Sequence, residues 1–355
     1  MFWKLKSEME EKILKAIFHR KSPEGVALLS APKPKLSLKT VLVKVHAAGL
    51  NPVDSKNLIG DKLPTWCEPL AKWKVEGKGV GFDFSGVVES APQNSGFHAG
   101  DEVYGTMPPM GGSIAEYISV PIHQLSKKPT NLTHIEAAAL PLVGLTCTEA
   151  FEDQKMLPGQ HLLVIGASGG VGHIAVQIAK AKGAIVTAIC GKKNFEFVKD
   201  LGADKIIDYN GENVIKELQD VIKQEGSFDI VLDTVSSHDP RDRAFNYEAK
   251  IRGANLLRKD GKSMYLTIGG VFKDWVCAWI KRVFKINLFA RGKLLFWVRF
   301  PYSSGYLETL TKYVQNGKLK LTISSILPFS SEGIQKGFQM LKSRKTKGKI
   351  VIKII

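Results

Sequence analysis

The sequence predicts an α/β protein with a β-rich domain and a doubly wound parallel sheet of six strands. Two observations carry this prediction. Short apolar segments separated by Gly and Pro, a pattern typical of strands, run from residue 13 to about residue 125 of a first domain that covers residues 13–137. Strand-like and helix-like segments then alternate through residues 138–319, as a parallel sheet with crossover helices requires. We expect residues 320–355 to return to the first domain and residues 1–12 to form a short extension.

The expected strands of the first domain are short and bounded by turn residues. They cover residues 14–18, 40–49, 82–90, 101–105 and 115–120. A more helical segment, residues 132–151, then leads into the second domain. The end of the chain contains a helix over residues 331–342, with apolar segments before and after it.

The second domain is expected to alternate six strands with helices. The strands cover residues 162–166, 185–190, 205–209, 229–235, 263–268 and 294–300. The helices cover residues 170–182, 194–201, 212–224 and 305–316. Because helices connect consecutive strands, the strands should run parallel and each crossover should be right-handed.

The composition excludes several classes of protein. With 355 residues, 44% of them apolar, the chain can form a packed core in each of two domains. No apolar run approaches the roughly 18 residues of a membrane-spanning helix. The N-terminus lacks the apolar core of a secretory signal, and Glu8, Glu10 and Glu11 argue against a transit peptide. We expect a cytoplasmic protein, with a peripheral position on an organelle membrane or a mitochondrial location as alternatives.

The cysteines indicate a reducing compartment. Four of them, Cys67, Cys147, Cys190 and Cys277, lie far apart and form no C-x-x-C pair. A structural zinc site needs ligands at short, regular spacing. We therefore expect neither disulfides nor structural zinc.

A glycine-rich loop joins an apolar strand to an amphipathic helix between residues 161 and 183. The loop reads A-x-G-x-x-G from Ala167 to Gly172. Its glycines leave room for a ligand close to the backbone, and the helix N-terminus presents free N–H groups to phosphate. A structural turn is the alternative, but the flanking strand and helix are the context that dinucleotide binding requires. The predicted pyrophosphate-binding residues are Gly166, Ala167, Ser168, Gly169, Gly170, Val171 and Gly172.

The end of the next expected strand indicates which dinucleotide binds. In NAD-binding sheets of this kind an acidic residue about 20 positions beyond the loop holds the ribose 2′-hydroxyl. Here the chain has Cys190, Gly191, Lys192 and Lys193 instead. No carboxylate repels a 2′-phosphate and two ammonium groups attract it, so the sequence predicts NADPH, bound at Gly191, Lys192 and Lys193. The alternative is that both lysines are only solvated at a helix start.

The chain is strongly basic, with 50 Lys and Arg against 34 Asp and Glu and a formal net charge of +16. Residues 273–299 contribute seven basic side chains and one acid, interleaved with aromatic residues. This combination suits peripheral membrane contact. We favour the other interpretation, a helix and a strand whose apolar side is buried and whose lysines are in water. We do not expect a nucleic acid partner, because no RNA-binding signature accompanies the charge.

Several motifs follow one another in an order known from a protein family. They are VLVKVHAAGLNPVDSK (41–56), GFDFSGVVES (81–90), GFHAGDEVYG (96–105), AALPLVGLTCTEA (138–150), GASGGVG (166–172), LGADKIIDY (201–209) and KGKIVI (347–352). Together they resemble the medium-chain dehydrogenase/reductase superfamily and, within it, the zinc-free quinone oxidoreductase-like branch. The chain is similar there to the reticulon-4-interacting and chloroplast-envelope quinone oxidoreductase homologues.

This resemblance implies a GroES-like catalytic domain combined with a Rossmann domain. Zinc-dependent members of the superfamily have a Cys at the position of Asn51 and a His at the position of Phe82. Neither replacement can serve as the missing ligand, so the resemblance implies a protein without catalytic zinc.

The resemblance also implies further cofactor contacts. They are Tyr209 at the adenosine ribose phosphate, Thr146 and Asn51 beside the nicotinamide ribose, Gly269 and Gly270 beside the nicotinamide, and Lys349 near the phosphates. Each has a structural alternative, such as a strand end for Tyr209, a helix hydroxyl for Thr146 and a hairpin turn for Lys349.

The expected reaction is hydride transfer from NADPH to a quinone or an α,β-unsaturated carbonyl compound, because no metal would polarise a simple carbonyl. Asn51, a backbone N–H or a bound water would stabilise the enolate that develops. Lys56 is the candidate proton donor, with a solvated lysine as the alternative, and Ser55 and Tyr104 are weaker candidates. The rival hypothesis is an NADPH-binding scaffold or peripheral membrane protein with little activity. The resemblance leaves a homodimer open.

Overall fold

The structure of the chain is a computed structural model. It describes residues 11–19, 21–56, 76–235, 247–259, 261–269, 272–284, 286, 288, 292–295, 298 and 303–355. The chain forms two compact units. The first contains residues 1–142, 300–311 and 323–355, and the second contains residues 143–299 and 312–322.

Strands dominate the first unit. Strand β1 (Lys12–Phe18) pairs antiparallel with β2 (Val26–Pro32). A larger sheet contains β3 (Thr40–Leu50), β4 (Asp83–Ser90), β5 (Glu102–Thr106), β6 (Tyr117–Pro121), β7 (Leu125–Lys127), β14 (Ile323–Pro328) and β15 (Lys349–Lys353). Its order is β14-β15-β3-β4-β5-β7, and β6 pairs with β3. The helices of this unit include α1 (Pro52–Lys56), α3 (His134–Ala138) and α11 (Ser331–Lys342).

Strand β3 contributes to two parts of the core because its register shifts between Val45 and Ala47. Before the shift, Val45 and the other odd-numbered valines of β3 pack in one apolar cluster. After it, Ala48 and Leu50 pack in a second cluster, with residues of α11. An added residue in a strand exchanges the faces of all residues that follow. The end of β3, and Asn51 after it, is placed by this shift.

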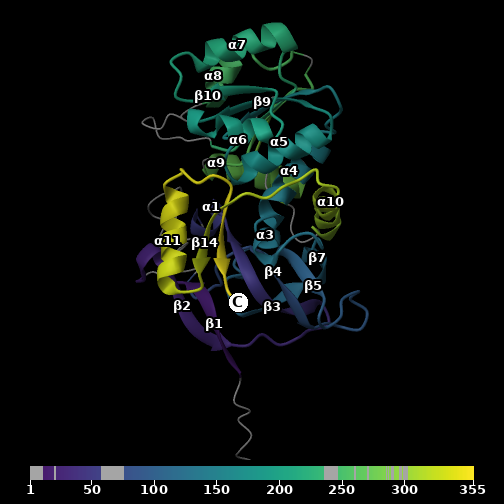
Figure 1. The fold of residues 1–355 in the computed structure, drawn as a ribbon, viewed down its shortest axis with the longest axis vertical. Helices are drawn as coiled ribbons and strands as arrows, with labels where there is room; N and C mark the ends of the chain where they lie inside the picture. Colours follow the sequence, from purple (N-terminus) through teal and green to yellow (C-terminus); the bar gives the residue numbers. More distant parts are fainter. Residues whose placement is uncertain are drawn as a thin grey trace, which may run out of the picture. The chain divides into compact units, whose positions relative to one another are not determined.

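The C-terminal segment completes the sheet that the N-terminal segment begins. Strand β15 lies between β14 and β3, parallel to β14 and antiparallel to β3. Helix α11 packs beside β14 and β15 (Figure 1). Gly337 allows this close packing, since a Cβ there would lie 2.3 Å from Leu50 Cδ1.

Residues 300–311 belong to the first unit, although the sequence prediction placed them in the second. The buried Tyr104 on β5 donates a hydrogen bond to the carbonyl of Leu307 at 2.5 Å. Its hydroxyl also lies 3.0 Å from Thr311 Oγ1. These bonds attach the start of α10 (Ser304–Gln315) to the sheet of the first unit. No local sequence pattern contains a contact of this range.

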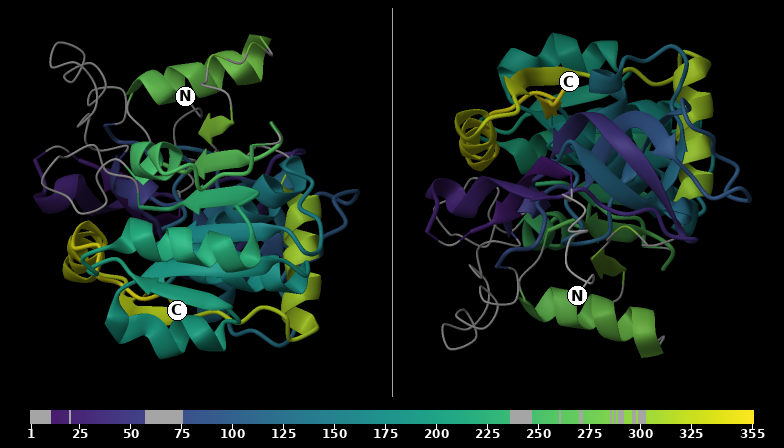
Figure 2. Two further views of the ribbon diagram at one scale, coloured as in Figure 1. Left: turned by 90° about the horizontal axis from the view of Figure 1, so that it is seen from above. Right: turned by 90° about the horizontal axis from the view of Figure 1, so that it is seen from below.

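The second unit is built on a parallel sheet. Its strands are β8 (His161–Ile165), β9 (Ile185–Cys190), β10 (Lys205–Asp208), β11 (Ile230–Asp233), β12 (Met264–Thr267) and β13 (Lys293–Leu295). Its helices include α4 (Pro141–Asp153), α5 (Gly170–Ala181), α6 (Phe195–Asp200), α7 (Val214–Glu225), α8 (Tyr247–Gly253) and α9 (Phe272–Phe284). The order β10-β9-β8-β11-β12-β13, with every pair parallel, confirms the predicted doubly wound sheet (Figure 2).

The sequence prediction missed short elements and misplaced some boundaries. Strand β7 has three residues, too few for a periodic pattern, and β2 ends in Pro32, which breaks a strand pattern. Helices α1 and α8 were also missed. The last strand of the parallel sheet covers Lys293–Leu295, and most of the rest of the predicted strand, residues 294–300, lies outside the described residues.

Candidate functional site

The glycine loop lies where β8 ends and α5 begins. Gly166 has a φ of +84°, and its N–H and that of Ala167 each donate to the carbonyl of Ile189 at 3.0 Å. At Gly172, a Cβ would lie only 2.1 Å from the Gly166 oxygen. Both positions therefore require glycine, and the turn brings the backbone close to the start of α5.

The N-terminus of α5 is suited to an anion. Its N-cap is Gly169, no side chain caps it, and its first turn has no acidic residue. The first N–H groups of a helix lack partners within the helix and sit at the positive end of its dipole. A helix start of this kind can hold a phosphate group, and pyrophosphate binding by the loop stays a prediction.

The predicted adenosine-side residues gather at the carboxyl ends of β8, β9 and β10. Asn194 Nδ2 donates to Ser168 Oγ at 3.0 Å, which connects the glycine loop to the turn after β9. Gly191 lies against Tyr209, because a Cβ at Gly191 would be 3.1 Å from the tyrosine Cε1. Lys192 and Lys193 are exposed in this turn. The Ser168–Asn194 bond was not predicted, since Asn194 belongs to no recognised motif.

No carboxylate stands at the end of β9. Its last residue, Cys190, is a buried thiol whose pKa is raised to about 12 by burial and, to a smaller extent, by Asp208. Asp208 ends the neighbouring strand β10, opposite Cys190, and accepts hydrogen bonds from the N–H and side chain of Asn210 at 3.0 Å. The predicted acid-free turn is therefore present, with Asp208 one strand away.

The other predicted residues of the second unit lie on α4 and after β12. Thr146 is buried on α4, and its neighbour Cys147 donates through its thiol to the carbonyl of Val171 at 3.5 Å. Gly269 follows β12, where its N–H donates to Thr267 Oγ1 at 3.3 Å. Gly270 lies outside the described residues. Thr146 is thus tied to the glycine loop through its neighbour.

A buried polar network in the first unit joins the ends of three strands. Lys349 Nζ donates to Asn51 Oδ1 at 2.5 Å and lies 3.2 Å from Asp83 Oδ2. Asn51 Nδ2 donates to the same Asp83 oxygen at 2.9 Å, and the N–H of Leu142 donates to Asp83 Oδ1 at 2.8 Å. All three network side chains are buried. The lysine and the carboxylate together fix the orientation of the Asn51 amide.

Lys349 is therefore not a residue of an open loop. It begins β15, and its ammonium group is bonded to Asn51 and Asp83 within the first unit. The contact with cofactor phosphates that the resemblance implied stays a prediction.

Asp54 adds a second buried carboxyl to this region, and sequence reasoning missed it. Its Oδ2 accepts a hydrogen bond from the N–H of Asn51 at 2.7 Å, and its Oδ1 has no hydrogen-bond partner among the described residues. Burial raises the pKa of Asp54 to about 8, and nearby Asp83 adds to the rise. Burial also raises the pKa of Asp83, but Lys349 opposes that rise. The signal that could have found Asp54 is an acid in the first turn of a helix that begins with Asn-Pro.

The three proton-donor candidates named from the sequence fare differently. The hydroxyl of Tyr104 is buried and bonded to α10, and burial raises its pKa, so the structure contradicts a role for it as a proton donor. Lys56 ends α1, five positions beyond Asn51. Its side chain, like that of Ser55, lies outside the described part of the structure.

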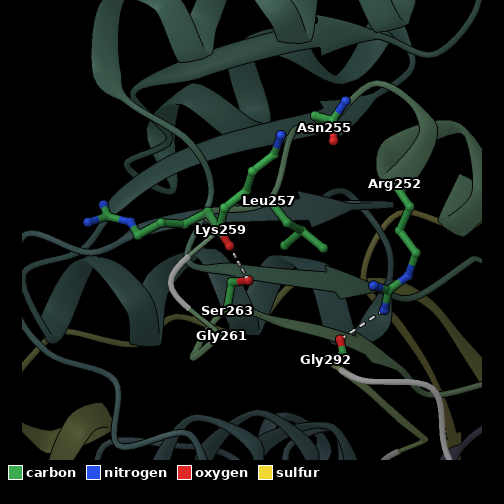
Figure 3. Close-up of a pocket in the computed structure, with 8 residues that line it drawn as sticks. Arg252, Asn255, Leu257, Lys259, Gly261, Ser263 and Gly292 are labelled. Carbon is green, nitrogen blue, oxygen red and sulfur yellow. Dashed lines mark hydrogen bonds between the residues drawn. The ribbon is translucent and has the colours of Figure 1, made fainter.

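A cavity of about 310 Å³ in the second unit is not part of the predicted site (Figure 3). Its lining includes Ser263 and Gly292, which precede β12 and β13. It therefore lies at the amino ends of the strands, whereas ligands of such sheets bind at the carboxyl ends. The arginines that line it are engaged: Arg252 bonds to Glu248 at 3.0 Å and to the Gly292 carbonyl, and Arg258 pairs with Asp229 at 2.9 Å.

Two family models match the chain. Residues 37–130 match an alcohol dehydrogenase GroES-like domain, and residues 170–263 match a domain described as zinc-binding dehydrogenase. The two matches fall in the first and the second unit, respectively.

Relatives and solved structures agree with these matches. The chain is 33% identical to the mouse mitochondrial NAD(P)H oxidoreductase RTN4IP1, over 89% of this chain and 82% of the relative. It is 32% identical to the tomato 2-methylene-furan-3-one reductase, over 90% and 73%. The quinone oxidoreductase from Coxiella burnetii has a TM-score of 0.76 and 26% identity, over 97% and 100%. The chain is an oxidoreductase that uses a nicotinamide cofactor, and it belongs to the quinone oxidoreductase-like branch of the medium-chain dehydrogenase/reductase superfamily.

Proposed function

We propose that this chain is a zinc-independent, NADPH-dependent reductase that transfers hydride to a quinone or an α,β-unsaturated carbonyl compound. The observation that carries the proposal is the closed network of Asn51, Asp83 and Lys349. It puts an ammonium group beside Asn51, at a position where zinc-dependent members of the family have a ligand. A reductase without a metal is best suited to conjugated acceptors, which delocalise the incoming charge.

The residues present do not fit a zinc ion. Among the described residues, no three His, Cys, Asp or Glu side chains are placed to hold a metal. Asn51 and Phe82 stand at two ligand positions, and both oxygens of Asp83 are already hydrogen-bonded. A cation at Asn51 would also meet the Lys349 ammonium, and like charges in a buried site repel strongly. We therefore propose that this chain binds no catalytic zinc, although the family model that matches residues 170–263 is described as a zinc-binding dehydrogenase.

The preference for NADPH rests on charge at the carboxyl edge of the parallel sheet. In the proposal the glycine loop holds the pyrophosphate, and the turn after β9 holds the 2′-phosphate through Lys192 and Lys193, next to Tyr209. One relative, 30% identical over 90% of this chain, is named NADPH-dependent alkenal/one oxidoreductase of Arabidopsis. That name, together with the tomato reductase, supports the class of acceptor and the cofactor.

When the acceptor takes up hydride, negative charge develops on its oxygen, and side chains of the protein have to stabilise that charge. A bound reduced nicotinamide supplies the hydride. The Asn51 amide is held by Asp83 and Lys349, and its remaining contact, the carbonyl of Gly49, is distant at 3.5 Å. We assign its second N–H to the oxygen on which negative charge develops. Lys56 is the proposed proton donor, and Thr146, Gly269 and Gly270 are the proposed contacts of the nicotinamide.

The test is NADPH oxidation by the full chain with a panel of simple quinones and enones. We expect turnover with several of them, a preference for NADPH over NADH, and no loss of activity with 1,10-phenanthroline. No turnover across the panel, despite tight NADPH binding, would contradict the proposal and favour the rival, a nicotinamide-binding scaffold. Loss of activity with the chelator, restored by zinc, would overturn zinc independence alone.

The location of the protein stays a prediction. None of the helices that the structure describes has the length and apolarity to cross a membrane. The mouse relative is named as mitochondrial, whereas we expected a cytoplasmic protein with a mitochondrial location as an alternative.

A further inference from the structure

Among the described side chains of helix α9, several large apolar ones are exposed, whereas small ones are buried. Val276, Trp279 and Val283 are 36%, 50% and 51% exposed. Their spacing places them on one face of the helix. Cys277 and Ala278, which point to the other side, are buried. A helix on the surface of a globular protein normally has the reverse arrangement.

The exposed face continues beyond the end of the helix. Phe284 is 58% exposed and stands edge-on to Trp279, with ring centroids 5.7 Å apart. Ile286 and Leu288 are more than half exposed as well. We call these residues, with Val276, Trp279 and Val283, the α9 apolar face. Helix α9 packs beside β13, the edge strand of the parallel sheet (green in Figure 2).

This finding corrects one expectation from the sequence. Residues 273–299 do contain a helix and a strand, as we favoured. Their apolar side was expected to be buried, but its largest described members face solvent. Helical periodicity indicates that an apolar face exists and does not indicate whether anything covers it.

The segment that carries the α9 apolar face is strongly basic in sequence. Residues 273–299 carry seven basic side chains and one acid, Asp274. That acid lies 3.5 Å from Lys293, which also pairs with Glu248 at 2.7 Å, so Lys293 is engaged within the second unit and the other six basic residues outnumber the acids of the segment. Lys281 lies on the helix itself and is half-buried, and burial lowers its pKa while Asp153 opposes the change. A partner of this segment should therefore be both apolar and anionic.

We propose that the α9 apolar face binds the surface of an anionic lipid bilayer. Trp, Phe and Val side chains would enter the boundary between headgroups and acyl chains, and the basic residues would meet lipid phosphates and carboxylates. A second copy of the chain is a poorer occupant. A two-fold contact would bring two copies of this strongly basic segment together. The inference does not depend on the proposed reductase activity.

The experiment is co-sedimentation of the full chain with vesicles. One set contains phosphatidylcholine alone, and the other contains phosphatidylcholine with about one third phosphatidylserine. We expect binding to the anionic vesicles only, with release as the salt concentration rises. This comparison uses the unaltered protein. Equal binding to both sets, or binding to neither, would overturn the proposal.

Two sets of variants locate the contact. Changing Lys281, Arg282 and Lys285 to Gln removes three charges, each of which should lower the partition coefficient roughly fivefold. The matched control changes three exposed lysines of the same unit, Lys199, Lys216 and Lys223, to Gln and should leave binding nearly unchanged.

The apolar variant combines Trp279→Ser with Phe284→Ser and should weaken binding roughly tenfold, because less apolar surface enters the interface. Leu157→Ser, at a residue that is 61% exposed elsewhere in the second unit, is its control. Trp279, Phe284, Leu157 and the three control lysines are exposed, so their substitution should not disturb the core. Thermal unfolding of each variant checks that it folds as the unaltered chain does.

Unchanged binding of either the charge or the apolar variant would contradict the assignment to α9. Light scattering after size-exclusion chromatography measures the oligomeric state and so tests whether a second copy of the chain covers the α9 apolar face. If the unaltered chain is a dimer that the apolar variant converts to a monomer, and neither binds vesicles, a second copy covers the face and the lipid proposal is wrong.

Discussion

Lys349 and Asp83 form an ion pair inside the first unit, with 3.2 Å between Nζ and Oδ2 and at most 3% of either side chain exposed. Asn51 bonds to both partners and closes the network. Burial removes both charges from water, so each charge depends on the other for compensation. The pair is therefore a structural element of the first unit as well as part of the candidate site.

Lys349→Met should destabilise the protein, because the buried Asp83 carboxyl group would lose the ammonium group that compensates its charge. Breaking a buried pair on one side costs about 3–5 kcal/mol in the free energy of unfolding. The control is Lys353→Met at the exposed end of the same strand, which should change stability by less than about 0.5 kcal/mol. Urea denaturation of both variants measures the difference, and equal midpoints would disprove the structural role.

Asp54→Asn should change how stability depends on pH. Burial raises the pKa of Asp54 from 3.8 to about 8 in the folded chain. The folded state therefore binds this proton more tightly, and its contribution to stability is lost as pH rises from about 4 to about 8. The steepest loss is about 1.4 kcal/mol per pH unit.

An amide at position 54 cannot ionise, so the Asn variant should lose less stability than the unaltered chain between pH 5 and pH 8. Urea denaturation at several pH values measures this difference. Asp200→Asn, at an exposed carboxylate of α6, is the control and should keep the original dependence. Parallel curves for Asp54→Asn and the unaltered chain would show that Asp54 is ionised in the folded state.

Changing Lys192 and Lys193 together to Gln should weaken NADPH binding and leave NADH binding nearly unchanged. Each lost charge-assisted contact with a 2′-phosphate is worth about 1.5 kcal/mol or more, roughly tenfold in affinity. The ratio of kcat/KM for the two cofactors measures this selectivity. Lys199→Gln, on the following helix, should not alter the ratio. An equal loss for both cofactors would argue against the assignment to the 2′-phosphate.

Gly172→Ala should abolish tight cofactor binding. The added Cβ would lie 2.1 Å from the Gly166 oxygen and 2.7 Å from Ala167 Cα, so the loop backbone has to move. We expect NADPH affinity to fall at least tenfold in a fluorescence titration. Gly305→Ala, where nothing lies within 4 Å of the new Cβ, should bind NADPH as the unaltered chain does. Normal binding by Gly172→Ala would mean that this loop does not hold the pyrophosphate.

Much of the second unit could be predicted because its signals are local. The glycine loop, the acid-free turn at Cys190 to Lys193 and the alternation of strands with helices all lie within short stretches of chain. The structure places Ser168, Gly191 and Tyr209 together as these patterns imply. Local patterns could not predict the role of Asn194. Its hydrogen bond to Ser168 depends on how the loop after β8 and the turn after β9 lie relative to each other.

The amino-acid sequence by itself determined the fold class, the family and the position of the glycine loop, since each depends on residue types at fixed short spacing. Only the tertiary structure decided the state of the buried groups and of the surface. Asn51 and Lys349 are 298 positions apart, and pairing of β15 with β3 brings them into one network. The exposure of Trp279 was decided in the same way, because burial depends on which distant segments cover a face.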